Sequence, residues 1–155
     1  MSDHDALMMG RAIALAQARL GQTGDNPSVG CVIAKDGVIL AEATTAPGGR
    51  PHAEEQALAA AGQAARGAQA YVTLEPCGER STGAASCGQR LVEAGVAEVV
   101  IACADPSPYA DGRGVERLRQ AGVAVRLGIM AAQAARLYAA YTPKARSGPS
   151  SEGAA

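Results

Sequence analysis

The sequence predicts an α/β fold in which helices cover both faces of one central sheet. Three observations predict it: short apolar runs alternate with helical patterns, an Asp-Gly turn joins the first two runs, and 155 residues suit one domain. Strands that alternate with helices need crossover connections, which place helices against the sheet. We expect a domain over residues 1–144 and a flexible tail over residues 145–155, rich in Ser, Gly, Pro and Ala, with no active-site role.

The first third of the chain is expected to form a helix and a β-hairpin. Apolar residues recur at helical intervals over residues 6–20, and Gly21 follows as a helix stop. Two apolar runs, residues 29–34 and 38–43, then flank Lys35-Asp36-Gly37. Because Asp-Gly supplies the positive backbone angles of a tight hairpin turn, these two strands are expected to pair antiparallel.

The rest of the chain alternates between helices and strands. Residues 51–61 read as a helix with Pro51 in its first turn, where a missing N–H loses no helix bond. A strand over 70–74, a helix over 87–93 closed by Gly95 and a strand over 98–102 follow. A polar loop then leads to a helix over 115–120, a strand over 123–127 and an alanine-rich helix to about residue 141.

Composition and charge favour a small-molecule partner. Apolar residues make up 48% of the chain and charged residues 19%, which excludes a disordered protein. The chain has neither Phe nor Trp, and its formal net charge is -1, so neither stacking platforms nor a phosphate-tracking basic stripe is evident. Nucleic acid is therefore not the favoured partner, although basic residues near the C-terminus leave transfer RNA as an alternative.

The four cysteines point to metal or catalytic use. The N-terminus lacks the pattern of a signal peptide, and no apolar stretch is long enough to cross a bilayer. We therefore expect a cytoplasmic protein with no membrane association, and in a reducing compartment cysteines seldom form disulfides. Cys31 and Cys103 fall in apolar strands and are assigned to packing.

Three short segments carry the chemistry: His52-Ala53-Glu54, Pro76-Cys77 and Cys87. A catalytic zinc takes about three protein ligands and keeps a fourth position for water, and one imidazole with two thiolates satisfies that count. His52, Cys77 and Cys87 are therefore the predicted Zn²⁺ ligands. Glu54 lies two residues from His52 and is the predicted proton carrier, because zinc lowers the pKa of water and a carboxylate can then move the proton.

Less specific interpretations stand beside this one. A lone histidine is more often an ordinary surface or core residue, but the only other histidine is His4, near the N-terminus. A zinc-stabilised binding module without catalysis would need a fourth ligand, such as Cys31 or Cys103, and would have no use for Glu54. Asn26 before Pro27 can be simply a turn residue.

On these residues the chain resembles the cytidine deaminase superfamily, and most closely its riboflavin-biosynthesis branch. His-Ala-Glu at 52–54 with Pro-Cys at 76–77 carries the resemblance to the superfamily. Asn-Pro-Ser-Val-Gly at 26–30 and Asp-Pro-Ser-Pro at 105–108 narrow it to the branch. The spacing differs from the short Pro-Cys-x-x-Cys form, since nine residues separate Cys77 from Cys87.

The resemblance implies a three-layer α-β-α sandwich around a five-stranded mixed sheet, with zinc held by His52, Cys77 and Cys87. It also implies hydrolytic deamination of a small nitrogen heterocycle, with a riboflavin-pathway aminopyrimidine as the best substrate. Asn26, Arg80 and Asp105 are the expected substrate contacts. Partners are expected to be further copies of the chain in a homo-oligomer and a separate reductase.

The segment between the zinc cysteines leaves the substrate open. Branch members usually carry His and Arg in a Pro-rich loop there, whereas residues 78–86 of this chain place Glu79 beside Arg80. Glu79 would repel a phosphate and only Arg80 would attract it. Cytosine, guanine, a nucleoside or a base from secondary metabolism are therefore the alternative substrates.

Overall fold

A mixed five-stranded sheet forms the centre of the protein, and the computed structural model describes residues 2–78, 85–105 and 112–141. The strands follow the order β2-β1-β3-β4-β5 across the sheet. β1 pairs antiparallel with β2 and with β3, whereas β3, β4 and β5 run parallel. The strands are β1 (Gly30–Lys35), β2 (Val38–Thr44), β3 (Gln69–Leu74), β4 (Glu98–Cys103) and β5 (Ala124–Leu127). The predicted mixed sheet and its hairpin are confirmed.

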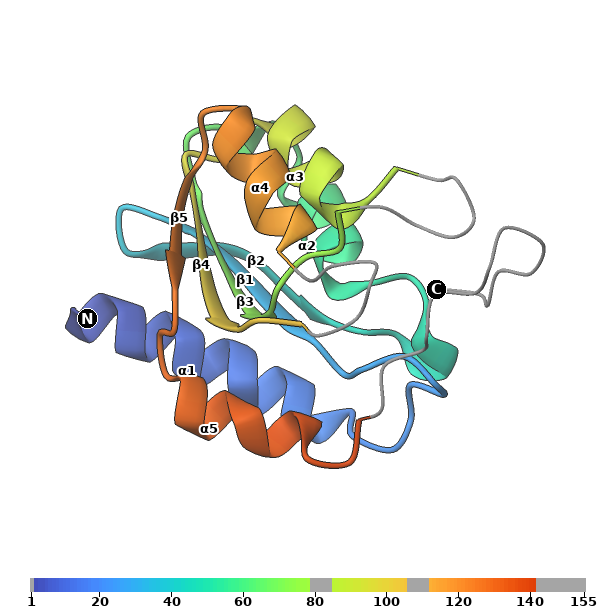
Figure 1. Ribbon diagram of the computed structural model, residues 1–155. Coiled ribbons are helices and arrows are strands. Elements are labelled where there is room, and N and C mark those ends of the chain that lie inside the picture. Colours follow the sequence, from blue (N-terminus) through green and yellow to red (C-terminus); the bar gives the residue numbers. More distant parts are fainter. Residues whose placement is uncertain (1, 79–84, 106–111, 142–155) are drawn as a thin grey trace.

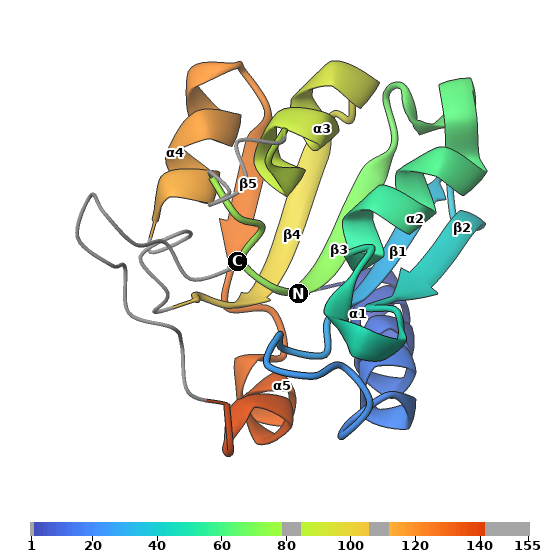
Figure 2. The ribbon, with the colours of Figure 1, turned by 90° about the vertical axis from the view of Figure 1, so that its right-hand side faces the viewer.

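Helices form a layer on each face of the sheet (Figures 1 and 2). On one face lie α1 (Asp3–Ala18) and α5 (Ala131–Ala135). On the other lie α2 (Ala53–Ala61), α3 (Cys87–Ala94) and α4 (Arg113–Gln120). The predicted three-layer α-β-α sandwich is therefore confirmed. Within the described residues, no helix combines the length and the apolar character that crossing a membrane requires.

Each face of the sheet has its own core, because successive side chains of a strand point to opposite faces. Toward α2, α3 and α4 the sheet presents Ile33, Val72 and Ile101 among its buried residues. Toward α1 and α5 it presents Val32 and Tyr71, which pack with Met8, Met9, Ala12 and Ala134. Burial on both faces explains why these strands read as continuous apolar runs.

The helix ends differ from the predicted ones where capping decides them. α1 begins at Asp3, not residue 6, because the Ser2 hydroxyl accepts a hydrogen bond from the Asp5 amide at 3.1 Å and the Asp5 carboxylate accepts one from the Ser2 amide. The prediction that Pro51 occupies the first turn of α2 was wrong. Pro51 precedes the N-cap residue His52, whose backbone is extended, and the helix begins at Ala53.

The C-terminal helix is shorter than predicted. α5 ends at Ala135, and a 3-10 turn, Arg136–Tyr138, continues the chain along the same face of the sheet. The tail predicted over residues 145–155 lies outside the described residues, as does Arg80.

An ion-pair cluster joins the N-terminus of α1 to the sheet. Arg126 of β5 donates to the Asp5 carboxylate at 2.7 Å and to the Glu98 carboxylate at 2.8 Å. The Asp5 side chain is 5% exposed and that of Arg126 is 38% exposed. The hydrogen bond from Arg126 is the main cause that holds the pKa of Asp5 far below its ordinary value, against the opposing effect of burial.

Candidate metal centre

Three elements bring His52, Cys77 and Cys87 together at the carboxyl end of β3. His52 is the N-cap of α2, Cys77 lies three residues beyond the end of β3, and Cys87 is the first residue of α3. The potential ligand atoms of these side chains all lie within 4.8 Å of one another. In the described part of the chain, no other His, Cys, Asp or Glu joins this group.

The geometry of the group fits a zinc ion. The Nδ1 atom of His52 lies 3.4 Å from Sγ of Cys87. In a tetrahedral zinc site, Zn–N near 2.0–2.1 Å and Zn–S near 2.3 Å separate nitrogen and sulfur by about 3.5 Å. One nitrogen and two sulfurs are also a donor set that zinc accepts in catalytic sites. The residues present therefore suit a zinc ion with one coordination position left for a small molecule.

Local hydrogen bonds favour the thiolate form of Cys77, which is the form that binds a metal cation. The Cys87 amide donates to Sγ of Cys77 at 3.2 Å, at the N-terminus of α3. The pKa of the Cys77 thiol is lowered, mainly by the hydrogen bond from the Cys87 side chain, and the partial positive charge of a helix N-terminus acts in the same direction. A thiolate is the form of cysteine that binds metal.

Glu54 is a buried acid beside the ligands. It occupies the second position of α2 and is 4% exposed. Burial raises the pKa of its carboxyl to about 7, which the charge of His52 opposes and the charge of Cys77 reinforces. A carboxyl with a pKa near neutrality can both take up and release a proton at working pH. Glu54 is not in the ligand group, so its carboxylate is available for that task.

Glu55 caps the start of α2 at His52. The His52 amide donates to Oε1 of Glu55 at 3.2 Å, and Arg90 of α3 lies 3.6 Å from Oε2 of the same carboxylate. Glu55 thus connects the start of α2, where His52 lies, to α3, where Cys87 lies. The two adjacent acidic residues of this first helical turn therefore have different environments: Glu54 is buried at the site, whereas Glu55 is paired with Arg90.

Glu75 was not singled out by the sequence analysis, yet it organises the loops around Cys77. Its buried carboxylate accepts hydrogen bonds from the Asp105 amide at 3.3 Å and from the Val115 amide at 3.4 Å. It therefore joins the end of β3 to the end of β4 and to α4. The sequence feature that could have predicted this role is the position of Glu75, an acidic residue between an apolar strand and Pro76-Cys77.

Gly114 allows α4 to approach the cysteine segment closely. A Cβ atom at this position would lie 1.8 Å from the Pro76 carbonyl oxygen. The Gly88 amide donates to the Cys77 carbonyl at 3.0 Å from the other side. The Pro76–Cys77 backbone is therefore held between α3 and α4.

The predicted substrate residues have different places. The Asn26 side-chain amide donates to the Gly49 carbonyl at 3.0 Å and so ties its loop to the segment before His52. Asp105 is 8% exposed and lies two residues beyond the end of β4, at the end of the sheet where Cys77 follows β3. Arg80 lies outside the described residues.

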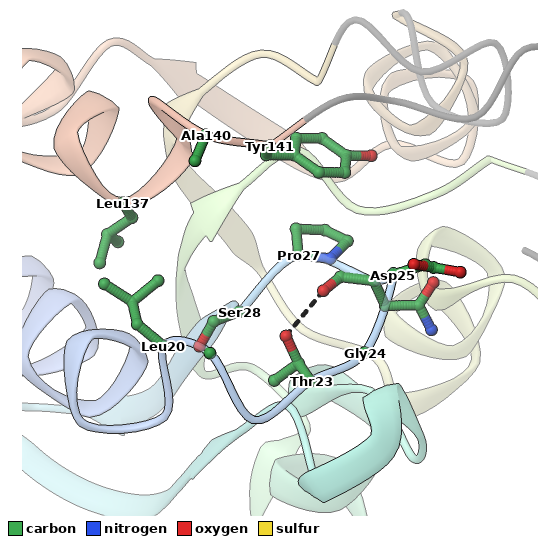
Figure 3. Close-up of a pocket in the computed structure, with 11 residues that line it drawn as sticks. Leu20, Thr23, Gly24, Asp25, Pro27, Ser28, Leu137, Ala140 and Tyr141 are labelled. Carbon is green, nitrogen blue, oxygen red and sulfur yellow. Dashed lines mark hydrogen bonds between the residues drawn. The ribbon is translucent and has the colours of Figure 1, made fainter.

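A cavity of about 560 Å³ opens beside the Asn26 loop (Figure 3). Leu20, Pro27, Leu137 and Tyr141 form part of its wall. Its polar groups are largely engaged within the protein, since the Thr23 hydroxyl donates to the Asn26 carbonyl and the Ser28 hydroxyl donates to the Ala16 carbonyl, each at 2.7 Å. No Lys or Arg of the described residues lines it.

The remaining cysteines lie apart from this group. Cys31 is fully buried in the core, and burial raises the pKa of its thiol well above the ordinary value. The Cys103 thiol donates to the Ala131 carbonyl at 3.5 Å and packs against both cores. Neither is among the clustered ligand atoms, which agrees with the packing role predicted for both.

Comparison with known proteins identifies the class. Residues 1–103 match the family described as the cytidine and deoxycytidylate deaminase zinc-binding region, and the chain belongs to this family. The family match spans β1 to β4, all three predicted ligands and Glu54.

Individual relatives refine the comparison. The riboflavin biosynthesis protein RibD of Escherichia coli is 46% identical over 144 residues, which are 93% of this chain and 39% of that protein. A solved structure of Acinetobacter baumannii RibD superposes with a TM-score of 0.84 at 45% identity, over 89% of this chain and 38% of that one. The chain thus spans about two fifths of these relatives. The diaminohydroxyphosphoribosylamino-pyrimidine deaminase of Buchnera aphidicola is 35% identical over 93% of this chain and 97% of its own length.

Proposed function

We propose that this chain is a zinc-dependent hydrolytic deaminase, with His52, Cys77 and Cys87 as zinc ligands and Glu54 as proton carrier. The observation that carries the proposal is the convergence of one imidazole and two thiols within 4.8 Å, at the start of the helix that buries Glu54. Membership of the deaminase family supports it.

The protein's own groups account for the proton movements of the reaction. When bound, zinc supplies Lewis acidity that lowers the pKa of water enough for addition to a ring carbon at neutral pH. Glu54 accepts a proton from the attacking water and delivers it to the ring nitrogen, and then takes the second proton from the added hydroxyl and delivers it to the departing amino group. The C–N bond breaks, ammonia leaves and the ring carbon keeps the oxygen. The raised pKa of Glu54 suits both directions of transfer.

We further propose that the substrate is a phosphoribosylated aminopyrimidine. The support is the activity for which the Buchnera aphidicola relative is named, since this chain matches that protein over almost its whole length. Asn26, Asp105 and Arg80 are the proposed contacts to this substrate. Asn26 precedes β1 by four residues, and antiparallel pairing places the amino end of β1 beside the carboxyl end of β3, the strand that leads to Cys77.

Ammonia release tests the proposal. Purified protein with zinc is expected to release one ammonia per molecule of diaminohydroxyphosphoribosylaminopyrimidine and to act far more slowly on cytosine, guanine and cytidine. Turnover of one of those bases instead would keep the deaminase class and replace the substrate. No ammonia from any of them would contradict the proposed function.

A closed structural zinc site is the rival interpretation. It requires a fourth protein ligand, and the described residues near His52 offer only Cys77 and Cys87 beside it. It also leaves Glu54 without a purpose, although burying an acid is costly. Both arguments favour catalysis. The homo-oligomer, the separate reductase and the cytoplasmic location stay predictions.

A further inference from the structure

A chain of three hydrogen bonds runs beneath the loop that carries Asn26. The Gly30 amide donates to Oγ1 of Thr73 at 3.0 Å, and that oxygen lies 2.7 Å from the Tyr138 hydroxyl. The Tyr138 hydroxyl donates to the Ser28 carbonyl at 2.9 Å. Because a phenol has one proton, and Tyr138 donates it to Ser28, Thr73 is the donor in the middle bond. Each hydroxyl therefore donates once and accepts once.

This chain of hydrogen bonds connects three parts of the molecule that are far apart in sequence. Thr73 belongs to β3, which leads to Cys77, while Ser28 and Gly30 lie where the Asn26 loop enters β1. Tyr138 ends the C-terminal 3-10 turn. Thr45 holds the same loop from the β2 side, since its hydroxyl accepts from the Val29 amide and donates to the Pro27 carbonyl.

The Tyr138 hydroxyl stays protonated at neutral pH. Burial raises the pKa of this phenol, the hydrogen bond with Thr73 lowers it, and the nearby acidic groups of Cys103, Glu54 and Asp105 raise it. Two of these three groups belong to predicted site residues. The phenol therefore keeps its proton at neutral pH and can donate it to the Ser28 carbonyl.

We propose that Tyr138 is a positioning residue of the deaminase site: through Thr73 and Ser28 it fixes the Asn26 loop against the end of β3 that leads to Cys77. This inference rests on the proposed function for its kinetic consequence, because Asn26 is the proposed substrate contact. Its structural consequence, an ordered entry into β1, is independent of catalysis. No neighbouring sequence pattern indicates the role, since the partners of Tyr138 lie 65 and 110 positions away.

The test compares Tyr138→Phe with Tyr71→Phe. Loss of the Tyr138 hydroxyl leaves the Ser28 carbonyl without its donor, so we expect KM for the aminopyrimidine to rise about ten-fold, with kcat and zinc content little changed. Tyr71 is the matched control, because its hydroxyl donates to Asp5 at 3.0 Å in the ion-pair cluster with Arg126. Tyr71→Phe is expected to lower stability and leave KM unchanged.

Variants of Thr73 and hydrogen exchange complete the test. Thr73→Val should raise KM like Tyr138→Phe, whereas Thr73→Ser keeps the hydroxyl and should have the normal KM. The effects of Thr73→Val and Tyr138→Phe on KM should be less than additive in the double variant, because both substitutions break the same chain of hydrogen bonds. Amide exchange at residues 28–30 should accelerate in Tyr138→Phe and not in Tyr71→Phe. Equal KM values for both tyrosine variants, or unchanged exchange, would overturn the proposal. An inactive parent with accelerated exchange would instead overturn the proposed function and leave the positioning role.

Discussion

The His52 ring nitrogen lies 3.4 Å from the Cys87 sulfur, although 35 positions separate the two residues in the chain. Both residues stand at the beginning of a helix, His52 as the N-cap of α2 and Cys87 as the first residue of α3. Both helices cover the same face of the sheet and begin at the same edge, beside the end of β3 (Figure 2). The metal site is therefore a consequence of the parallel arrangement of two β-α connections.

Removal of a thiol should remove the metal. Cys87→Ala leaves two ligand side chains, so the purified variant is expected to contain much less than the one zinc per chain expected for the parent. Elemental analysis after dialysis measures it. Cys103→Ala is the matched control, since Cys103 is outside the ligand group and should keep its zinc. Equal zinc in both variants, or none in the parent, would contradict the ligand assignment.

Neutralising Glu54 should abolish proton transfer and preserve the site. Glu54→Gln keeps the size of a buried side chain, so zinc content and melting temperature are expected to stay near the parent values while kcat falls about 10²- to 10⁴-fold. Glu93→Gln makes the same chemical change on the exposed face of α3 and should leave kcat unaltered. Normal turnover by Glu54→Gln would rule out its proposed role.

A methyl group at Gly114 should displace the cysteine segment. Gly114→Ala places Cβ against the Pro76 carbonyl, so the helix or the Pro76–Cys77 backbone must shift, at a cost of about 1–3 kcal/mol in unfolding free energy and with weaker zinc binding. Gly10→Ala is the control, because nothing lies within 4 Å of a Cβ there and the change improves α1 by roughly 0.5–1 kcal/mol. Urea unfolding and competition with a chelator measure the two effects. Equal stability of both variants would contradict the prediction that the space between Gly114 and the Pro76 carbonyl is too small for a methyl group.

Stability should fall in acid as the Asp5 pair is lost. The pKa of Asp5 lies far below its ordinary value in the folded protein, so its contribution is fully present above the ordinary pKa of about 3.9 and is lost progressively as pH falls from there through the lowered folded-state pKa. Because Arg126 is more than one third exposed, solvent screening limits the contribution to about 1–2 kcal/mol. Asp5→Asn is therefore expected to destabilise the protein most at pH 6 and progressively less as pH falls below about 3.9, measured by urea unfolding. A difference that does not vary with pH would exclude the ion pair as its cause.

The fold was largely predictable because its signals are local. The Asp-Gly turn between residues 35 and 38 specified the hairpin, and continuous apolar runs specified strands buried on both faces. Boundaries that depend on side-chain caps were less accurate. Ser2 and Asp5 extend α1 toward the N-terminus, and the extended backbone of His52 keeps Pro51 out of α2.

The sequence by itself determined the chemical types available to the site: an imidazole, two thiols and a carboxylate near one of them. Only the tertiary structure decided that the ligand atoms converge, that Glu54 is buried enough to have a pKa near neutrality, and that Glu75 and Tyr138 hold the surrounding loops. The physical reason is the separation along the chain over which each kind of interaction acts. Turn and helix signals act over a few residues, whereas desolvation and hydrogen bonds between distant segments exist only once the sheet has brought those segments together.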